Sequence, residues 1–392
     1  MAKLIEITGK ALSGEWGTDD ETGEGIPVLR TTNFTNEGVV DYSDVVKRTI
    51  TKKNIDDKYL RPGDIIIEKS GGSDKQPVGR VIYFDGPDKT YLFNNFTGLL
   101  RVKEQNKWFP KYVFYSLYGN YRRGGTRPFE NKTTGLHNLK TDDYVSRYEV
   151  KEVEYSKQVK ISSHLDKLYS IIKMREEELV KLDELIKARF VEMFGNPNVN
   201  EMNWDMGVIN DIGQCVAGAT PSTKVNEYWE DGTIPWMSSG EVNKGRIYET
   251  DTKISQLGYD NASTKLVPPK TVVLAMAGQG KTRGTTAITE IELCTNQSIC
   301  SIVNNERVNP EYLLYFLKMQ YKELRGASTN TDGRGGLNLK IIGNYPIMIP
   351  PINKQNEFEE FVKQVDKSKV AVQKALDEAQ LLFDSLMQDY FG

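Results

Sequence analysis

The sequence predicts an α+β protein in which two similar mixed α/β domains are separated by two long antiparallel coiled-coil helices, so that the chain is a pseudo-twofold internal repeat. Three observations support this prediction. The chain has 392 residues, which is more than one hydrophobic core usually holds. Its second half repeats features of its first half in the same order, about 200 residues later. Each half also ends in a long stretch whose apolar residues have the spacing of a coiled coil.

The composition is that of a folded globular protein. Hydrophobic residues make up 38% of the chain and charged residues 27%, so the chain can bury cores of its own. The net charge of −3 and the pI near 5.8 do not favour a nucleic-acid-binding protein, because such proteins often present a basic face. A subunit of a larger complex can still concentrate lysine and arginine on one face while its acidic helices lower the total charge.

Several classes of function are not expected. The sequence has no run of about 18 apolar residues, and its start, MAKLIEITGK, lacks the pattern of a secretion signal. We therefore expect a cytoplasmic protein with no membrane partner. The three cysteines have no metal-ligand spacing, and His137 and His164 are the only two histidines. We therefore expect neither a metal site nor an acid–base mechanism based on histidine.

The internal repeat consists of five features. In chain order these are an apolar segment at 25–29 and 233–237, a turn leading into an apolar strand at 60–67 and 266–274, a glycine-rich basic loop at 68–80 and 275–284, a short helix at 111–117 and 311–317, and a polar stretch ending in Asn-Leu-Lys at 138–140 and 338–340. Chance would not readily repeat five features in one order. We place the first domain at 1–156 and the second at 196–352.

The segments 157–195 and 353–392 are expected to form the two long helices, and both end in Phe-Gly. Because each helix follows an equivalent domain, the pseudo-twofold repeat makes the two helices antiparallel. About 35 residues form a rod of roughly 50 Å, which is longer than one turn of DNA. The residues expected to pack between the helices are Ile161, Leu165, Leu168, Ile172, Leu179, Leu182, Ile186, Phe358, Val365, Val372, Ala379, Leu382 and Leu386.

The order of domain, helix, domain and helix, together with the phrase LIKARFVEMFGNP at 185–197, resembles the specificity subunits of type I restriction-modification systems. The resemblance covers the whole chain. It includes GDIII at 63–67 before a glycine-rich basic loop, and the segment 345–351 before Gln355 and the last helix. The first domain departs from this pattern, because the segment 148–158, which leads from this domain into the first long helix, lacks the proline pair found in the second domain.

The resemblance implies two target-recognition domains, each reading one half of a bipartite double-stranded DNA target. It also implies that the helices act as a ruler that sets the spacer between the half-sites. Two methyltransferase subunits are implied to dock along the helices, and restriction (translocase) subunits to join them. S-adenosylmethionine, ATP and Mg are implied to bind those partners. No cofactor is expected on this chain, which we expect to be non-catalytic.

Candidate DNA contacts follow from the residue types in the polar loops. Arg, Lys, Asn and Gln read base edges in the major groove, while Ser, Thr, Lys and backbone amides hold phosphates. In the first domain the expected contacts are Arg30, Thr31, Asn33, Lys69, Ser70, Lys75, Arg80, Arg122, Arg123, Arg127, Lys132 and Asn138. In the second domain they are Ser238, Ser239, Lys281, Thr282, Arg283, Thr285, Arg325, Asn330, Arg334 and Asn338.

Two alternative functions remain. The segment 275–282, AMAGQGKT, satisfies a relaxed phosphate-loop pattern with Ala at the first Gly position and would make the chain a nucleoside triphosphatase. A phosphate loop needs a helix that starts at its Lys-Thr pair, whereas the following segment 283–289 is β-branched and contains a glycine. The other alternative is a coiled-coil scaffold whose globular ends bind proteins instead of DNA.

Overall fold

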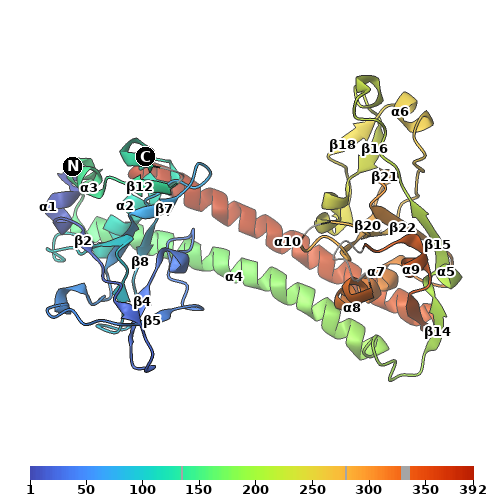
Figure 1. Ribbon diagram of the computed structural model, residues 1–392, viewed down its shortest axis with the longest axis horizontal. Helices are drawn as coiled ribbons and strands as arrows, with labels where there is room; N and C mark the ends of the chain where they lie inside the picture. Colours follow the sequence, from blue (N-terminus) through green and yellow to red (C-terminus); the bar gives the residue numbers. More distant parts are fainter. Residues whose placement is uncertain (134–135, 279, 328–335) are drawn as a thin grey trace. The chain divides into compact units, whose positions relative to one another are not determined.

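The computed structural model describes residues 1–133, 136–278, 280–327 and 336–392, which form two compact units (Figure 1). Unit 1 comprises Met1–Arg175 and Ala375–Gly392, and unit 2 comprises Glu176–Lys374. Each unit therefore contains one globular domain together with a part of each long helix.

Unit 1 is built around two small sheets. One is antiparallel with the strand order β2-β10-β6-β8, and the other has the order β3-β5-β4-β9, in which β4 and β9 run parallel. The central strand β6 contains three fully buried isoleucines, which suit a pleated, covered strand. The elements up to the first long helix are β1 (Ala2–Lys3), α1 (Leu4–Thr8), β2 (Leu12–Ser13), β3 (Thr18–Asp19), β4 (Ile26–Leu29), η1 (Thr31–Asn33), β5 (Val46–Thr49), η2 (Asp56–Lys58), β6 (Ile65–Glu68), β7 (Ser70–Gly72), β8 (Val81–Tyr83), β9 (Leu92–Phe93), β10 (Thr97–Leu100), α2 (Pro110–Arg122), η3 (Arg127–Phe129), β11 (Glu130–Thr133), β12 (Leu136–Leu139), α3 (Thr141–Arg147) and β13 (Glu149–Val150).

Helix α2 joins the first sheet of unit 1 to the C-terminal helix. It begins with Pro110 at its first position, where the missing N–H has no partner to lose. One face packs against β8. On another face Gly119 permits close approach, since a Cβ there would lie 2.9 Å from Cε of Met387. A Cβ at position 119 would therefore require the flexible end of the Met387 side chain to shift.

Unit 2 repeats the strand order of unit 1. Its sheets have the orders β15-β22-β19-β20-β17 and β18-β16-β21, and β16 and β21 run parallel as β4 and β9 do. The predicted internal repeat and α+β fold class are thus confirmed. The elements of this domain are β14 (Asp205–Val208), α5 (Ile209–Ile212), β15 (Gly213–Ala217), η4 (Asn226–Tyr228), β16 (Ile234–Met237), η5 (Ser239–Lys244), β17 (Arg246–Ile247), β18 (Thr252–Ile254), α6 (Gln256–Asp260), β19 (Val272–Ala275), β20 (Thr286–Thr289), β21 (Cys294–Thr295), β22 (Ile299–Asn304), α7 (Pro310–Met319), α8 (Tyr321–Ala327), α9 (Leu339–Gly343) and β23 (Pro346–Ile349).

Peripheral elements distinguish the two domains. Unit 1 contains a further sheet of order β11-β12-β7 beside the loop that follows β6. Unit 2 contains the edge strand β17, which pairs parallel with β20. Two helices, α7 and α8, follow β22 in unit 2, where the single helix α2 follows β10 in unit 1. The shared sheets are therefore the common frame, and the elements around the loops differ between the domains.

The long helices α4 (Tyr155–Phe194) and α10 (Ile352–Phe391) have 40 residues each. In unit 2 the end of α4 lies against the start of α10, since the ring centroid of Phe358 is 5.5 Å from that of Phe190 and 5.6 Å from that of Phe194. In unit 1 the start of α4 and the end of α10 share one core, through residues such as Leu165 and Phe383. Opposite ends of the two helices meet in each unit, so the pairing is antiparallel.

The residues predicted to pack between the helices are mostly inaccessible to solvent. Those that are buried are Ile161, Leu165, Ile172, Ile186, Phe358, Val365, Val372 and Ala379. Those that are partly buried are Leu168, Leu179, Leu182 and Leu386.

Leu382 is an exception among the residues predicted to pack between the long helices. It is 49% exposed, whereas the adjacent Phe383 is 4% exposed and its ring lies 6.4 Å from that of Tyr115 on α2. The buried positions in this part of α10 are Ala379, Phe383 and Met387, which are four residues apart. A straight helix drifts from a strict seven-residue repeat, and here it turns towards α2 as well as α4. The prediction for Leu382 is therefore wrong.

A buried glutamine in the first turn of each long helix attaches that helix to its domain. In unit 1, Oε1 of Gln158 accepts a hydrogen bond of 2.9 Å from the backbone N–H of Phe109. In unit 2, Oε1 of Gln355 accepts one of 2.8 Å from the backbone N–H of Asn309. Phe109 and Asn309 each precede the proline that begins α2 or α7. Both side-chain amides also donate to main-chain carbonyls, so their polar groups are satisfied inside the core.

Candidate nucleic-acid interface

A hollow of about 640 Å³ in unit 1 gathers four of the cations predicted to contact DNA. Its lining includes Lys75, Arg122, Arg123 and Arg127, together with Asn36 and Gln76, and it is referred to below as the basic hollow. These residues come from the loop after β7, the end of α2, the start of η3 and the loop after η1. No carboxylate is among the described residues that line it.

Two of the four cations in the basic hollow are bound to α10. Nη1 of Arg122 lies 2.6 Å from Oδ1 of Asp384, and Nη2 of Arg123 donates a hydrogen bond of 2.6 Å to the carbonyl of Phe391. Within the described part of the chain, the side chains of Lys75 and Arg127 form no ion pair or hydrogen bond. The hollow thus combines two fixed cations with two that have no polar partner in the described ranges of the chain.

A second hollow of about 540 Å³ in unit 1 is referred to below as the polar hollow. It lies beside the start of the glycine-rich loop at 68–80. It is lined by the predicted residues Lys69, Ser70 and Asn138, and also by Ser13, Asn95 and the 54% exposed Phe96. Nζ of Lys69 donates a hydrogen bond of 3.0 Å to Oγ of Ser13, and burial lowers the pKa of Lys69. Hydroxyl and amide groups both donate and accept, as base-edge reading requires.

Sequence reasoning missed Ser13, Asn95 and Phe96 in the polar hollow. They are separated from Lys69 and Asn138 along the chain and belong to no motif. The pairing of β2 with β10 and of β10 with β6 brings them together.

The side chain of Arg80 binds other groups within unit 1. Its guanidinium binds Glu68 through Nη2 at 2.9 Å and Nε at 3.1 Å, and Glu68 is 1% exposed. Its Nη1 and Nη2 also donate to the carbonyls of Phe34 and Thr31. Because all of its nitrogens have protein partners, Arg80 holds the turn η1 against β6. The prediction that Arg80 contacts DNA is corrected accordingly.

Asn33 has a similar structural role. It is 2% exposed, and its Nδ2 donates to the carbonyls of Asp41 and Asp44 at 2.9 and 3.0 Å. Its Oδ1 accepts from the backbone N–H of Arg30 at 2.9 Å. Asn33 therefore shapes the loop instead of reaching DNA, which corrects that prediction too. Arg30 forms an ion pair with Asp44 at 2.9 Å, and Thr31 is partly exposed.

Arg325 supports the glycine-rich loop between β19 and β20 in unit 2. Its Nη1 donates to the carbonyls of Gly280 at 2.9 Å and Arg283 at 3.0 Å. Oη of Tyr321 donates to the carbonyl of Lys281 at 2.8 Å. Arg325 was expected to contact DNA itself, but these contacts make it a support for the loop that carries the exposed Lys281.

The other candidates in unit 2 divide into capping residues and loop residues. Ser238 lies at the start of η5 and donates to Oε2 of Glu241 at 3.1 Å, while Oδ1 of Asn338 accepts from the N–H of Ile341 at 2.9 Å and caps α9. Ser239, Thr282, Arg283 and Thr285 are partly exposed. Asn330 and Arg334 lie outside the described residues, as does the side chain of Lys132 in β11.

The glycine-rich loop of unit 2 does not lead into a helix. It runs from β19 into the strand β20, and its described residues from Gly280 to Thr285 form turns. A phosphate loop holds its ligand with the amides of a helix that begins at the Lys-Thr pair. The nucleoside triphosphatase alternative therefore lacks its central element, and Gln279 lies outside the described residues.

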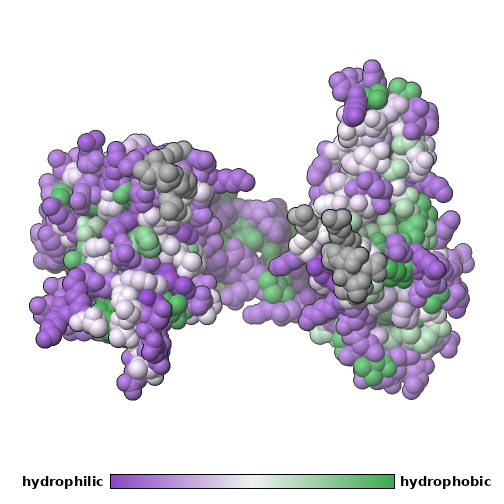
Figure 2. Space-filling view, viewed as in Figure 1, coloured by the Kyte–Doolittle hydropathy of each residue, from purple (hydrophilic) through white to green (hydrophobic). Residues whose placement is uncertain are grey.

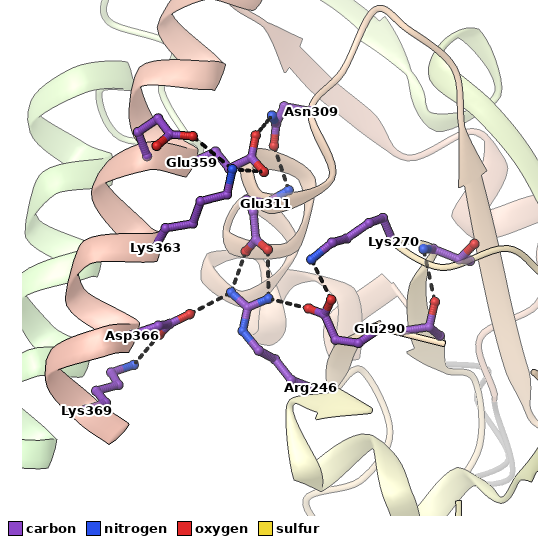
Figure 3. A network of polar contacts seen from close by, with 12 residues as sticks. Arg246, Lys270, Glu290, Asn309, Glu311, Glu359, Lys363, Asp366 and Lys369 are labelled. Carbon is purple, nitrogen blue, oxygen red and sulfur yellow. Dashed lines mark hydrogen bonds and ion pairs between the residues drawn. The ribbon is translucent and has the colours of Figure 1, made fainter. Parts of the chain in front are cut away.

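A network of ion pairs in unit 2 links the domain to α10 (Figure 3). Arg246 on β17 donates to both carboxylate oxygens of Glu311 on α7, at 2.7 and 2.8 Å. Its other contacts include Asp366 on α10, at 2.9 Å. Lys369 of α10 in turn pairs with Asp183 of α4. Because Glu311 is 3% exposed, this network is structural and not part of the open loop surface.

The face of each unit seen in Figure 2 is mainly hydrophilic, with scattered hydrophobic residues. Among the described helices, none is long and apolar enough to cross a membrane. Over the same ranges of the chain, no three His, Cys, Asp or Glu side chains are grouped so that they could hold a metal ion.

Residues 2–184 and 201–379 match the family described as type I restriction modification DNA specificity domain. These two segments make up most of the chain, so the chain belongs to this family. The two matched segments correspond to the two halves of the internal repeat.

Individual relatives carry related names. The chain is 30% identical over 172 residues to the type I restriction enzyme MjaIX specificity subunit of Methanocaldococcus jannaschii, an alignment that covers 41% of this chain and 39% of the relative. It is 23% identical over 168 residues to the type I restriction enzyme EcoR124I/EcoR124II specificity subunit of Escherichia coli, covering 42% and 41%. The alignments thus span about two fifths of the length of these relatives.

Two solved structures share the fold. The S subunit of a type I restriction-modification system from M. genitalium superposes with a TM-score of 0.59 at 15% identity, over 100% of this chain and 95% of that one. A chain from the structural work on complex assembly and conformational transition of the type I restriction-modification system gives a TM-score of 0.60 at 14% identity, over 100% and 96%. At such low identities the likeness bears on the fold alone.

Proposed function

We propose that this chain is the DNA sequence-specificity subunit of a type I restriction-modification complex, in which each domain reads one half of a bipartite duplex target. The observation that carries the proposal is the repeated frame: equivalent strands, β6 and β8 in unit 1 and β19 and β20 in unit 2, flank a glycine-rich basic loop in each domain. The names of the relatives support the same function. Two readers of one fold suit a target with two separate halves.

The proposed DNA contacts lie in the basic hollow, the polar hollow and the glycine-rich loop of unit 2. Cations would hold phosphates and fix the register, while amides and hydroxyls would read base edges. In unit 1 the proposed residues are Thr31, Lys69, Ser70, Lys75, Arg122, Arg123, Arg127 and Asn138. In unit 2 they are Ser239, Lys281, Thr282, Arg283 and Thr285, and Arg30, Lys132, Ser238, Asn330, Arg334 and Asn338 stay predictions.

The proposal extends to partners. The long helices would set the spacer and dock two methyltransferase subunits, and restriction subunits would join the complex in the cytoplasm. Ile171 and Met174 on α4 are 39% and 58% exposed and line one hollow together with Phe109, which supports docking of a protein along this helix. Methyl transfer and ATP-dependent steps, with S-adenosylmethionine, ATP and Mg, would then belong to the partners, and this chain would be non-catalytic.

A domain exchange tests the proposed function. Replacing residues 200–350 with the corresponding segment of another family member should change one half of the methylated sequence and leave the other half unchanged. Methylation-sensitive sequencing of DNA from cells that also produce the methyltransferase subunits measures this, with the original chain as the control. If both halves of the sequence stayed the same, the scaffold alternative would be favoured over DNA reading.

An insertion tests the role of the helices as a ruler. Within unit 2, the Asp183–Lys369 pair in antiparallel helices places Glu177 roughly opposite Lys374. Inserting about four residues at both positions adds roughly 6 Å of helix, so the spacer between half-sites should lengthen by about one or two base pairs. The same sequencing measures the spacer, and Glu177→Ala without an insertion is the matched control. An unchanged spacer would contradict the ruler.

A further inference from the structure

The basic hollow of unit 1 concentrates positive charge beyond what the fold requires. Arg122 and Arg123 are accounted for by packing, since they bind Asp384 and the carbonyl of Phe391 on α10. Cations also suit the last turn of α2, where carbonyls carry negative partial charge. Neither reason applies to Lys75 and Arg127, which come from other segments and have no partner among the described side chains. Four cations around one hollow whose described lining residues include no carboxylate should attract an anion.

The walls of the basic hollow are fixed without a ligand. Nε2 of Gln76 donates to Oδ1 of Asn36 at 2.9 Å, and Oη of Tyr121 donates to the carbonyl of Pro77 at 3.3 Å. The turn after α2 passes through Gly124 at φ +74°, where a Cβ would lie 3.4 Å from Cδ of Arg127. The side chain of Arg127 is therefore folded over this turn. A site whose walls are already ordered loses less entropy on binding.

The chemistry of the basic hollow differs from that of the polar hollow. The polar hollow offers hydroxyls, amides, one lysine and the carboxylate of Asp142, which together can distinguish donors from acceptors. The basic hollow offers mainly charge, and Lys75 is a point charge on a flexible stem that tolerates many anion positions. Charge of this kind binds phosphate groups without regard to base sequence.

We propose that the basic hollow is the site at which unit 1 binds backbone phosphates of duplex DNA independently of sequence, leaving base reading to other groups such as those of the polar hollow. The inference rests on the proposed function, because it takes the duplex as the source of the phosphate. It divides the candidate residues of unit 1 into two sets with different measurable effects.

Lys75→Ala and Arg127→Ala test this proposal, because neither side chain has an ion-pair or hydrogen-bond partner among the described residues whose loss would confuse the result. The full chain is titrated with labelled duplexes of unrelated sequence between about 50 and 200 mM salt. Each variant should weaken binding about five- to tenfold, equally for all duplexes, and reduce the slope of log K against log salt by about 1. Thermal unfolding should be unchanged. Lys160→Ala, an exposed cation on α4, is the matched control and should retain the full slope.

Four outcomes separate the possibilities. An unchanged salt slope in the Lys75→Ala/Arg127→Ala double variant would overturn the proposal, and so would a loss of affinity confined to one duplex sequence, which indicates base reading. Titration with ATP and with inorganic phosphate forms the second arm. Binding of either that depends on Arg127, with duplex binding unaffected, would assign the hollow to a free phosphate compound instead. If the unsubstituted chain bound no duplex at low salt even together with the methyltransferase subunits, the proposed function itself would fail.

Discussion

Phe358→Ala is expected to lower the free energy of unfolding of unit 2 by about 3–5 kcal/mol. Phe358 is fully buried, and its ring centroid lies 5.5 Å from that of Phe190, 5.6 Å from that of Phe194 and 5.5 Å from that of Tyr315. These rings come from α4 and α7, so one side chain joins both long helices to the domain. Alanine would leave a cavity that three fixed rings cannot fill.

Urea unfolding of the Phe358→Ala variant measures the loss, and hydrogen exchange of individual peptides assigns it to unit 2. Val370→Ala is the matched control on the same helix, because Val370 is 71% exposed, and it should change stability by no more than about 0.5 kcal/mol. If Phe358→Ala cost less than about 1 kcal/mol, the proposed junction of the two helices would not be a packed core.

Arg246→Met is expected to destabilise unit 2 by a comparable amount, about 3–5 kcal/mol. Glu311 would remain buried, with its side chain 4% exposed, after losing both hydrogen bonds from Arg246. Glu290 would retain Lys270 at 2.6 Å, and Asp366 would retain Lys369. The loss of stability therefore comes mainly from leaving the carboxylate of Glu311 buried without a partner. The lost attraction between Arg246 and its carboxylates contributes less.

A second substitution distinguishes this cause from simple loss of packing. Glu311→Gln added to Arg246→Met removes the unpaired charge, so the double variant should unfold at higher urea than Arg246→Met alone. Lys107→Met is the control for an exposed pair, since Lys107 and Glu152 have side chains 55% and 47% exposed, and it should cost no more than about 0.5 kcal/mol. A double variant no more stable than Arg246→Met would contradict the buried-charge explanation.

The sequence predicted the repeat and the helices because these depend on local patterns. Glycine-rich loops, short apolar strands and the spacing of apolar residues are each visible within about ten residues of chain. Among the residues predicted to pack between the helices, Leu382 is exposed. Phe383 is buried in its place because its ring lies near Tyr115, a residue far away in the chain. The spacing of apolar residues within α10 does not show that α2 also packs against this part of the helix.

The candidate site was harder to predict because residue type does not reveal the partner. Arg80 and Lys75 lie in one loop, yet Arg80 meets Glu68 on the buried strand β6 while Lys75 faces open space. Arg325 was selected as a cation, but the carbonyls of Gly280 and Arg283 are 45 and 42 residues away in the chain. Whether an arginine reads DNA or supports a loop is decided by such non-local contacts.

The division of the chain into compact units affects how it folds during synthesis. Unit 2 is the continuous segment Glu176–Lys374, whereas unit 1 needs Ala375–Gly392 to cover α2 and the start of α4. The core of unit 1 is therefore completed after that of unit 2, and the apolar face of α2 stays open until the last turns of α10 have been synthesised. In a nascent chain of this architecture the inner unit can close its core first, because the helical segment that completes the outer unit is synthesised after it.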